Sequence, residues 1–208
     1  MQPIAHSMRL LTAGAVAAAV FLAGTNAAAA PSPVAPVAGA SRSGYDRLHL
    51  LADLSAQRLA TAALVAAAKW GTGRPIDDPA RERQVLDAVA RQAREAGGEP
   101  GETVRIFHEQ IEANKRVQRA MHSRWDTDPS EAPTRRPDLT EVREEINRVN
   151  GELVRAIADS VSVRTGASCD GILTAAEVIV RRHRGLDRLH TTALTHALAS
   201  VCASASVG

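Results

Sequence analysis

The sequence predicts an all-α protein, a helical bundle of about six helices that ends in a C-terminal helical hairpin. Apolar residues recur at spacings of three and four over long stretches, as on the buried face of an amphipathic helix. Aromatic residues make up only 2% of the chain, and no segment shows the long alternation that is typical of strands. The 208 residues suffice for one domain with a real core, which we expect over residues 45–208.

Residues 1–30 have the features of a cleavable signal peptide. Arg9 precedes an apolar run over residues 10–24 that is short for a membrane span, and the alanines of residues 25–30 offer cleavage sites. Residues 31–44 are typical of a flexible linker. The sequence therefore predicts a secreted or periplasm-like protein without a stable membrane anchor after cleavage. An uncleaved anchor is the alternative.

The charge balance and the motifs exclude several classes of function. Removing residues 1–30 takes away one cation, so that 24 cationic residues face 23 acidic ones and the net charge is +1. Such a balance is not the basic footprint of a nucleic-acid-binding protein. The seven histidines show no metal-ligand spacing, and the motifs of nucleotide-binding loops, zinc proteases and serine hydrolases are absent. We expect no metal, no cofactor and no nucleic-acid partner.

The first helix is expected from about Asp46 to Trp70. Its buried row contains two cations, Arg58 and Lys69, which are 11 residues apart and therefore point the same way, about 16 Å from each other. Either their long stems lie on the core while the charged ends reach water, or both ends face a ligand. The apolar members of the row are Leu51, Leu54, Ala62 and Val65.

The second helix is expected to begin at Pro79 after Asp78 as N-cap, and to end at the glycines 97–98. Arg81 lies in its first turn, where a positive charge opposes the helix dipole. An anion held at the helix start would explain this placement. A salt bridge to Asp77 or Asp78 is the alternative. The predicted buried stripe is Val85, Leu86, Val89, Ala93 and Ala96.

The third helix is expected from Pro100 to about Trp125. Two neutral amides, Asn114 and Gln118, interrupt the middle of its apolar row. Buried amides need hydrogen-bond partners, so the pair either faces a polar ligand or sets the register of the bundle. The apolar members of the row are Val104, Phe107, Ile111, Met121 and Trp125.

The fourth helix follows Asp138, which makes a capping-box pattern with Glu141. Arg143 lies at the edge of its buried face, either as an exposed rim residue or as a further cation of a site. The residues expected to be buried are Leu139, Val142, Ile146, Val149, Leu153 and Ile157.

Residues 166–202 predict two short helices that meet near Gly185. Cys169 and Cys202 are the two cysteines of the chain, and an even number in an exported protein favours one disulfide, which would close a loop of about 33 residues. Two free buried thiols are the alternative.

Four cations thus occupy positions that face inward or stand at the edge of a buried face: Arg58, Lys69, Arg81 and Arg143. Each has an ordinary explanation when it is taken alone, but four such explanations at once are less economical than a common one. If the helices bring these cations together with the two amides of the third helix, they form a pocket suited to a small dianion.

The motifs around these residues resemble, in order and spacing, those of the all-helical (AroQ-type) chorismate mutases, specifically the exported, monofunctional subclass. The resemblance covers about residues 46–202. It is carried by QRLA with Arg58, VAAAKW with Lys69, PIDDPARERQ with Asp78, Arg81 and Glu82, QIEANKRVQ with Asn114 and Gln118, and DLTEVREEINRVN with Arg143. In that subclass a disulfide joins cysteines at a separation like that of Cys169 and Cys202.

The resemblance implies an isomerase that rearranges chorismate to prephenate by an intramolecular Claisen step, with no cofactor. Such an enzyme holds a dicarboxylate in a reactive conformer and stabilises the negative charge that grows on the ether oxygen. The resemblance also implies a homodimer in which each site lies largely within one chain, because Arg143 is available in the same chain.

The roles of the site residues are implied in the same way. The three arginines would clamp the carboxylates. Lys69 and Gln118 would donate hydrogen bonds to the ether oxygen. Glu82 or the backbone of Asp78 would accept a hydrogen bond from the ring hydroxyl, and Asn114 would support a carboxylate.

The chain departs from some exported relatives, which carry Thr in place of Asn114 and Glu in place of Gln118. Val85, where one relative has a pocket glutamine, is not counted among the site residues. The second reading of the sequence is an exported helical module that binds a small dicarboxylate without turnover. Lys69 together with Gln118 argues against it, because a binder needs carboxylate clamps but no paired donors for an ether oxygen.

Overall fold

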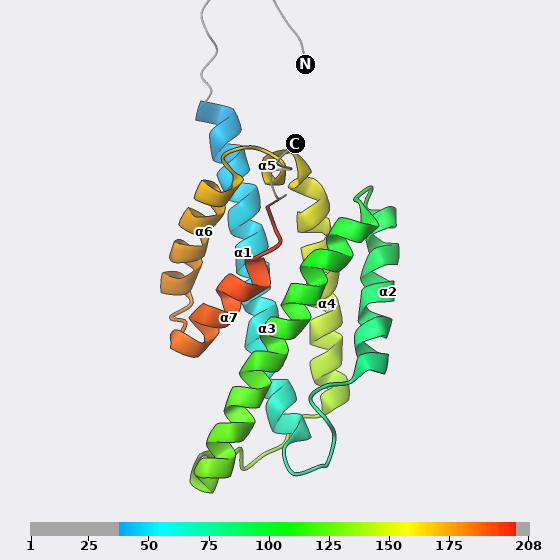
Figure 1. Ribbon diagram of the computed structural model, residues 1–208, viewed down its shortest axis with the longest axis vertical. Helices are drawn as coiled ribbons and strands as arrows, with labels where there is room; N and C mark the ends of the chain where they lie inside the picture. The colour runs from blue at the N-terminus through cyan, green and yellow to red at the C-terminus, as the bar shows by residue number, and fades with distance from the viewer. Residues whose placement is uncertain (1–37, 203–208) are drawn as a thin grey trace, which may run out of the picture. The chain divides into compact units, whose positions relative to one another are not determined.

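The computed structural model describes the backbone of residues 38–202 and the side chains of residues 43–202 (Figure 1). Within this part the chain is all-helical, as predicted, and has no strand. The predicted signal peptide, residues 1–30, and residues 31–37 of the predicted linker lie outside the described residues. The elements are α1 (Ala38–Lys69), α2 (Pro79–Glu95), α3 (Pro100–Thr127), the 3-10 turn η1 (Pro129–Glu131), α4 (Leu139–Asp159), α5 (Val161–Arg164), α6 (Cys169–His183) and α7 (Arg188–Leu198).

The long helix α1 is the centre of the bundle. It packs against α3, α4, α6 and α7, and α2 covers α3 and α4 (Figure 1). Its segment Ser43–Lys69 is long and apolar enough to cross a membrane by length and composition alone, but 67% of its most apolar window is buried inside the bundle. The apolar character of α1 is therefore accounted for by the core, where Leu48, Leu51 and Leu59 are almost completely buried.

The start of α1 differs from the prediction. The helix begins at Ala38 and not near Asp46, so that the last residues of the predicted linker are helical. Gly44 is buried against Val163, and a Cβ atom at Gly44 would lie 3.3 Å from the Val163 Cγ2 atom. This close packing stabilises the extra helical turns, whereas the glycine and serine content of the segment favours a linker.

The second helix begins and ends where the sequence predicts. The Asp78 carboxylate accepts a hydrogen bond from the backbone N–H of Arg81, at 3.0 Å, and so caps the helix. Gly97 follows the helix with a φ of +72°, the left-handed conformation that ends many helices. The predicted buried stripe is wrong at Ala96, which is exposed because it is the C-cap residue and the helix has already ended.

The registers of α3 and α4 follow the predicted rows. Asn114 and Gln118 are buried in the middle of α3, with 7% and 4% of their surface exposed. In α4, the Asp138 carboxylate caps the helix by accepting a hydrogen bond from the backbone N–H of Thr140. The short elements η1 and α5 were not predicted, because single turns are too short to show a helical period.

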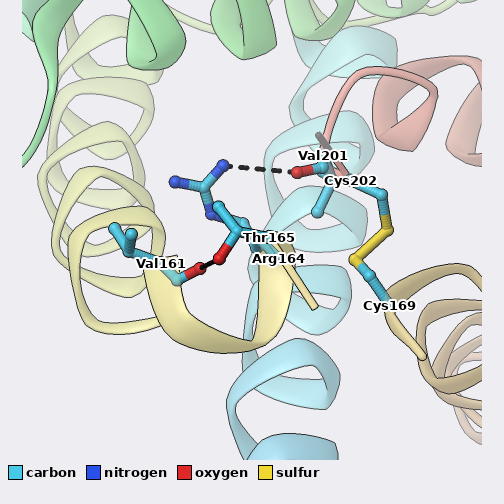
Figure 2. Close-up of a disulfide and its surroundings, with 6 residues drawn as sticks. All are labelled: Val161, Arg164, Thr165, Cys169, Val201 and Cys202. Atoms are coloured by element: carbon cyan, nitrogen blue, oxygen red, sulfur yellow. Dashed lines mark hydrogen bonds between the residues drawn. A yellow bond between two sulfur atoms is a disulfide. The ribbon is translucent and has the colours of Figure 1, made fainter. Parts of the chain in front are cut away.

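The predicted disulfide is present between Cys169, at the start of α6, and Cys202, beyond the end of α7, with Cα atoms 5.8 Å apart (Figure 2). Beside it, the Arg164 side chain is almost completely buried. Its guanidinium donates hydrogen bonds to the carbonyl of Val201, at 3.3 Å, and to the carboxylate of Glu102, at 2.9 Å. The disulfide and Arg164 therefore tie the C-terminal segment to α6, α5 and α3.

Removal of the disulfide should lower stability while the bundle still folds. The bond spans 33 residues, for which the loop-entropy model gives about 3–4 kcal/mol. We expect the melting temperature of the Cys169→Ser, Cys202→Ser double variant to fall on the order of 10 °C, as measured by calorimetry. The wild-type protein should resist thiol alkylation until it is reduced, and full alkylation without a reductant would contradict the bond.

Candidate active site

One cavity brings all eight predicted site residues together. It has a volume of about 110 Å³ and is lined by α1, α2, α3, α4 and the loop that joins α1 to α2. Its apolar surface comes from Val65, Ile76, Val85, Ile111, Leu139 and Ile146. Its polar surface comes from Arg58, Lys69, Asp78, Arg81, Glu82, Asn114, Lys115, Gln118 and Arg143. All of these polar residues except Lys115 were predicted from the sequence.

The guanidinium of Arg58 is buried, so the explanation that its end reaches water is wrong for this residue. Its Nε donates a hydrogen bond to Asn150 Oδ1 at 2.9 Å, and its Nη1 donates to the carbonyl of Gln110 at 2.7 Å. Its carbon Cζ lies 5.7 Å from the centre of the Phe107 ring. Within the described residues it makes no ion pair. Burial lowers the pKa of Arg58 to about 10, so it remains charged at neutral pH.

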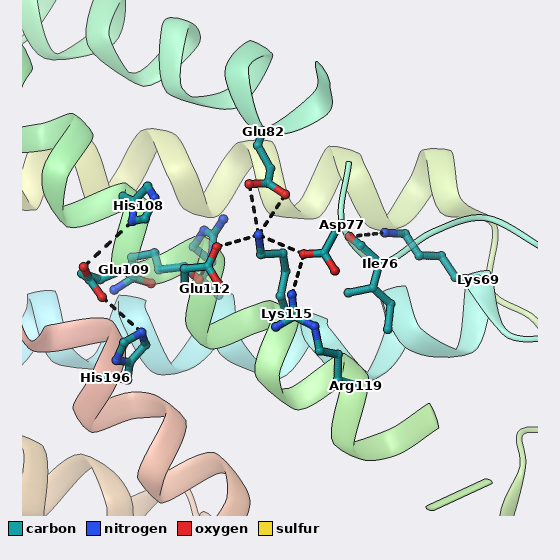
Figure 3. A network of polar contacts seen from close by, with 12 residues as sticks. Lys69, Ile76, Asp77, Glu82, His108, Glu109, Glu112, Lys115, Arg119 and His196 are labelled. Carbon is teal, nitrogen blue, oxygen red and sulfur yellow. Dashed lines mark hydrogen bonds and ion pairs between the residues drawn. The ribbon is translucent and has the colours of Figure 1, made fainter. Parts of the chain in front are cut away.

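Lys69 lies at the other end of the same row, and it is half-buried. Its Nζ donates one hydrogen bond, to the carbonyl of Ile76 at 3.3 Å (Figure 3). Burial lowers the pKa of Lys69; the negative charge of Asp78 opposes this shift and the positive charge of Arg143 adds to it. The ammonium therefore faces the cavity with a backbone carbonyl, and no carboxylate, as its hydrogen-bond partner.

Arg81 and Arg143 complete the set of cations. Arg81 Nη1 donates to Gln84 Oε1 at 3.3 Å, and the alternative of a salt bridge to Asp77 or Asp78 is wrong, because no such pair forms. Arg143 is partly exposed and, among the described residues, makes neither a hydrogen bond nor an ion pair. All four predicted cations thus line one cavity, and none of them is in ion-pair contact with a carboxylate of the residues that the structure describes, which is an arrangement that attracts an anion.

The two amides of α3 form a short chain of hydrogen bonds. Asn114 Nδ2 donates to the carbonyl of Arg58 at 3.3 Å, and Gln118 Nε2 donates to Asn114 Oδ1 at 2.6 Å. The bond to the backbone fixes the orientation of Asn114, which in turn orients Gln118. Gln118 lines the cavity, and in the described part of the chain its Nε2 makes this one hydrogen bond, whereas its buried Oε1 makes none.

Lys115 is the cavity residue that the sequence analysis missed. Its Nζ lies 3.0 Å from Glu82, 3.2 Å from Asp77 and 2.5 Å from Glu112 (Figure 3). Burial alone would lower the pKa of Lys115, but the hydrogen bonds with the three carboxylates outweigh it and raise the pKa. The positive charge of Lys115 is therefore neutralised by carboxylates, and its hydrogen bonds hold Glu82 in place at the cavity wall.

No sequence signal distinguished Lys115 from a surface lysine. It lies one position after Asn114, off the row that faces the core, and Glu112 three residues before it suggests an ordinary exposed pair. Its other two partners come from α2 and from the loop before α2, and only the folded chain brings them near.

Residues 49–119 match the family described as chorismate mutase type II. The chain is 39% identical over 152 residues to a secreted chorismate mutase of Mycolicibacterium smegmatis. The aligned region is 73% of this chain and 84% of that protein. It is 35% identical over 159 residues to a secreted chorismate mutase of Mycobacterium tuberculosis. Here the aligned region is 76% of this chain and 80% of that protein. A crystal structure of chorismate mutase from Burkholderia phymatum aligns with a TM-score of 0.73 and 33% identity, over 78% of this chain and 99% of that one.

The two lysines of the cavity should respond oppositely to the same substitution. The folded protein holds the pKa of Lys69 below its unfolded value of 10.5, so charged Lys69 destabilises the fold, and this penalty fades as pH rises from the folded pKa towards 10.5. Lys69→Met should therefore raise the melting temperature at pH values of about 7.

The matched control is Lys115→Met. The folded protein raises the pKa of Lys115, so its charge stabilises the fold below its unfolded pKa, and its removal leaves three carboxylates close together. Its melting temperature should fall at pH values of about 7. A similar fall in both variants would contradict the distinction between an uncompensated and a compensated lysine.

Proposed function

The chain belongs to the chorismate mutase family, and we propose that it rearranges chorismate to prephenate in the cavity between α1, α2, α3 and α4. The observation that carries this assignment is the set of four cations without ion-pair partners: Arg58, Lys69, Arg81 and Arg143. Chorismate carries two carboxylates, and the rearrangement is a conversion of one molecule into its isomer. The enzyme is an isomerase that needs no cofactor for this step.

The reaction breaks the C–O bond of the enolpyruvyl ether while a C–C bond forms within the same molecule. No proton, nucleophile or redox group takes part, so the enzyme has two tasks. It holds the two reacting ends of the substrate close together, and it stabilises the negative charge that grows on the ether oxygen. We assign the first task to Arg58, Arg81 and Arg143, whose guanidinium groups suit bidentate contact with carboxylates.

We assign the second task to Lys69 and Gln118. Both side chains line the cavity, on α1 and α3, and each has an N–H group that is free to donate. Asn114 orients Gln118 and supports a substrate carboxylate. The charge on Lys69 and the fixed amide of Gln118 would act in a partly dry site, where such donors are worth more than in water.

Of the two acceptors considered for the ring hydroxyl, we favour the Glu82 carboxylate. The Asp78 carboxylate already caps α2, and its backbone carbonyl accepts the helical hydrogen bond from the N–H of Glu82. Both oxygens of Glu82 accept from Lys115, at 3.0 and 3.1 Å, but a carboxylate has about four lone-pair sites and can accept a further bond.

The proposal extends to location and assembly. The relatives from Mycolicibacterium smegmatis and Mycobacterium tuberculosis are named secreted chorismate mutases. We propose that residues 1–30 are a cleavable signal peptide and that the mature enzyme is extracytoplasmic, with no stable membrane anchor. The Cys169–Cys202 disulfide supports this, because such bonds persist in oxidising compartments. We further propose a homodimer in which each chain holds a complete site.

A direct assay on the purified protein tests the function. The ultraviolet absorbance of chorismate should decay at a rate proportional to protein concentration, and prephenate should appear in equal amount. Binding of chorismate without prephenate would instead support the module that binds a dicarboxylate without turnover.

Arg143→Ala should lower kcat/KM on the order of 10²-fold or more, because a substrate carboxylate then loses a charged partner. Arg155→Ala is the matched control, since Arg155 is exposed on the same helix and does not line the cavity. We expect the control to keep nearly full activity in the same assay. Equal activity of both variants would show that Arg143 is a rim residue.

The side chain at position 118 should determine whether kcat/KM depends on pH. Its amide donates at every ordinary pH, so wild-type kcat/KM should be nearly flat between pH values of about 5 and 8. Gln118→Glu should be poor at pH values of about 7.5, where an ionised carboxylate repels the ether oxygen, and should recover as pH falls. Gln118→Ala should be poor throughout. Wild-type activity of Gln118→Glu at neutral pH would show that Gln118 does not face the breaking bond.

A further inference from the structure

The Arg58 guanidinium donates a hydrogen bond to a residue outside the candidate active site. Asn150 lies on α4 and is 4% exposed, and its Oδ1 accepts the hydrogen bond from Arg58 Nε at 2.9 Å. Asn150 does not line the cavity that contains Arg58 and the other predicted site residues. The second partner is the backbone carbonyl of Gln110, at 2.7 Å from Arg58 Nη1. Both partners are acceptors without a charge.

We infer that Asn150 is a positioning residue of the reaction, which orients Arg58 towards the substrate and leaves its positive charge unneutralised. This inference rests on the proposed function. A guanidinium has five N–H donors in a fixed plane. The bonds to Asn150 and Gln110 occupy Nε–H and one N–H of Nη1, so both N–H groups of Nη2 and the second N–H of Nη1 remain. These remaining groups suit a bidentate contact with one carboxylate.

The neutral side chain at position 150 is what makes this arrangement useful for binding. An aspartate would accept the same hydrogen bond from Nε, but it would also form an ion pair inside the protein. That pair would compete with the substrate carboxylate for the charge of Arg58. Lys115, which also lines the cavity, is an example of a cation with such ion pairs, because three carboxylates already neutralise its charge. The two buried cations are thus treated differently, one with neutral acceptors and one with acids.

The position of Asn150 also links it to a second clamp. Asn150 follows Arg143 by seven residues on α4, which is two helical turns, so both side chains project from the same face. Arg143 lines the cavity directly, and Asn150 reaches Arg58 behind it. One helix therefore supplies one guanidinium and orients another.

The decisive variant is Asn150→Asp, because it separates orientation from charge. A side chain with only a structural role would be served as well or better by aspartate, which keeps the size and the acceptor. Both explanations predict an unchanged or higher melting temperature for Asn150→Asp. Only a positioning role also predicts a fall in kcat/KM of about 30-fold or more, which should appear largely in KM. Asn150→Ala should also lower kcat/KM, about 10-fold, through loss of orientation.

Two controls make the test specific. Asn147→Asp places the same charge one turn earlier on α4, at an exposed position that lines a neighbouring pocket with Arg81 and Asn150 but has no hydrogen bond to Arg58, and should change kcat/KM less than about threefold. In an Arg58→Ala background, Asn150→Asp should have no further effect, because its target is gone. A separate measurement needs no turnover: the Nε–H signal of Arg58 in nuclear magnetic resonance should exchange slowly with water in the wild type and faster in Asn150→Ala.

The outcomes distinguish this inference from the proposed function. If the wild type converts chorismate and Asn150→Asp keeps kcat/KM within about threefold, the inference is wrong and the function stands. An equal loss in Asn147→Asp, or a loss that persists without Arg58, would also overturn it. If the wild type shows no turnover, the proposed function fails, while the exchange of the Arg58 Nε–H still decides whether Asn150 holds the guanidinium.

Discussion

The buried positive charge of Arg58 connects three helices of the bundle. The side chain starts on α1, its Nε is bonded to Asn150 on α4, and its Nη1 is bonded to the carbonyl of Gln110 on α3. The amide of Gln110 in turn donates to Ser55 on α1 and to the carbonyl of Ala197 on α7. Among the described residues Arg58 has no counter-ion, so its charge is stabilised by uncharged acceptors, and these acceptors join α1 to α3 and α4.

The cations of the protein differ in whether a carboxylate neutralises their charge, and the charge of the cavity depends on this difference. Lys115 and Arg164 are buried with carboxylate partners, and they join segments that are far apart in the sequence. Within residues 43–202, the hydrogen-bond partners of Arg58, Lys69 and Arg81 are uncharged, and the Arg143 side chain has none. Hydrogen bonds with carboxylates favour the charge of Lys115, whereas burial disfavours the charges of Arg58 and Lys69, which a bound anion would favour. We therefore expect different cations of the chain to serve stability and substrate binding.

Much of the fold could be predicted from the sequence because its signals are local. Caps such as Asp78 and Asp138, the glycines after α2 and the spacing of apolar residues each act within a few positions of the chain. Six of the eight predicted residues, the four cations and the two amides, were noticed because they lie on a buried row, at its edge or at a helix start. Asp78 was predicted as an N-cap, Glu82 came from the family resemblance, and the resemblance gave each of the eight a proposed role. The structure brings these residues to one cavity, and their contacts with substrate remain predictions.

The parts that could not be predicted depend on contacts between distant segments. Lys115 looks like a surface lysine until Asp77 and Glu82 are placed beside it, and Asn150 looks like an ordinary polar residue of α4 until Arg58 reaches it. The early start of α1 depends in the same way on the packing of Gly44 against Val163.

The presence of all eight predicted site residues around one cavity of a single chain has a consequence for the exported enzyme that we propose. A protein that leaves the cell is diluted, and a site built between subunits would be lost as the subunits separate. Here α1, α2, α3 and α4 of a single chain supply every cation around the cavity. We therefore expect the catalytic rate per chain to be independent of protein concentration.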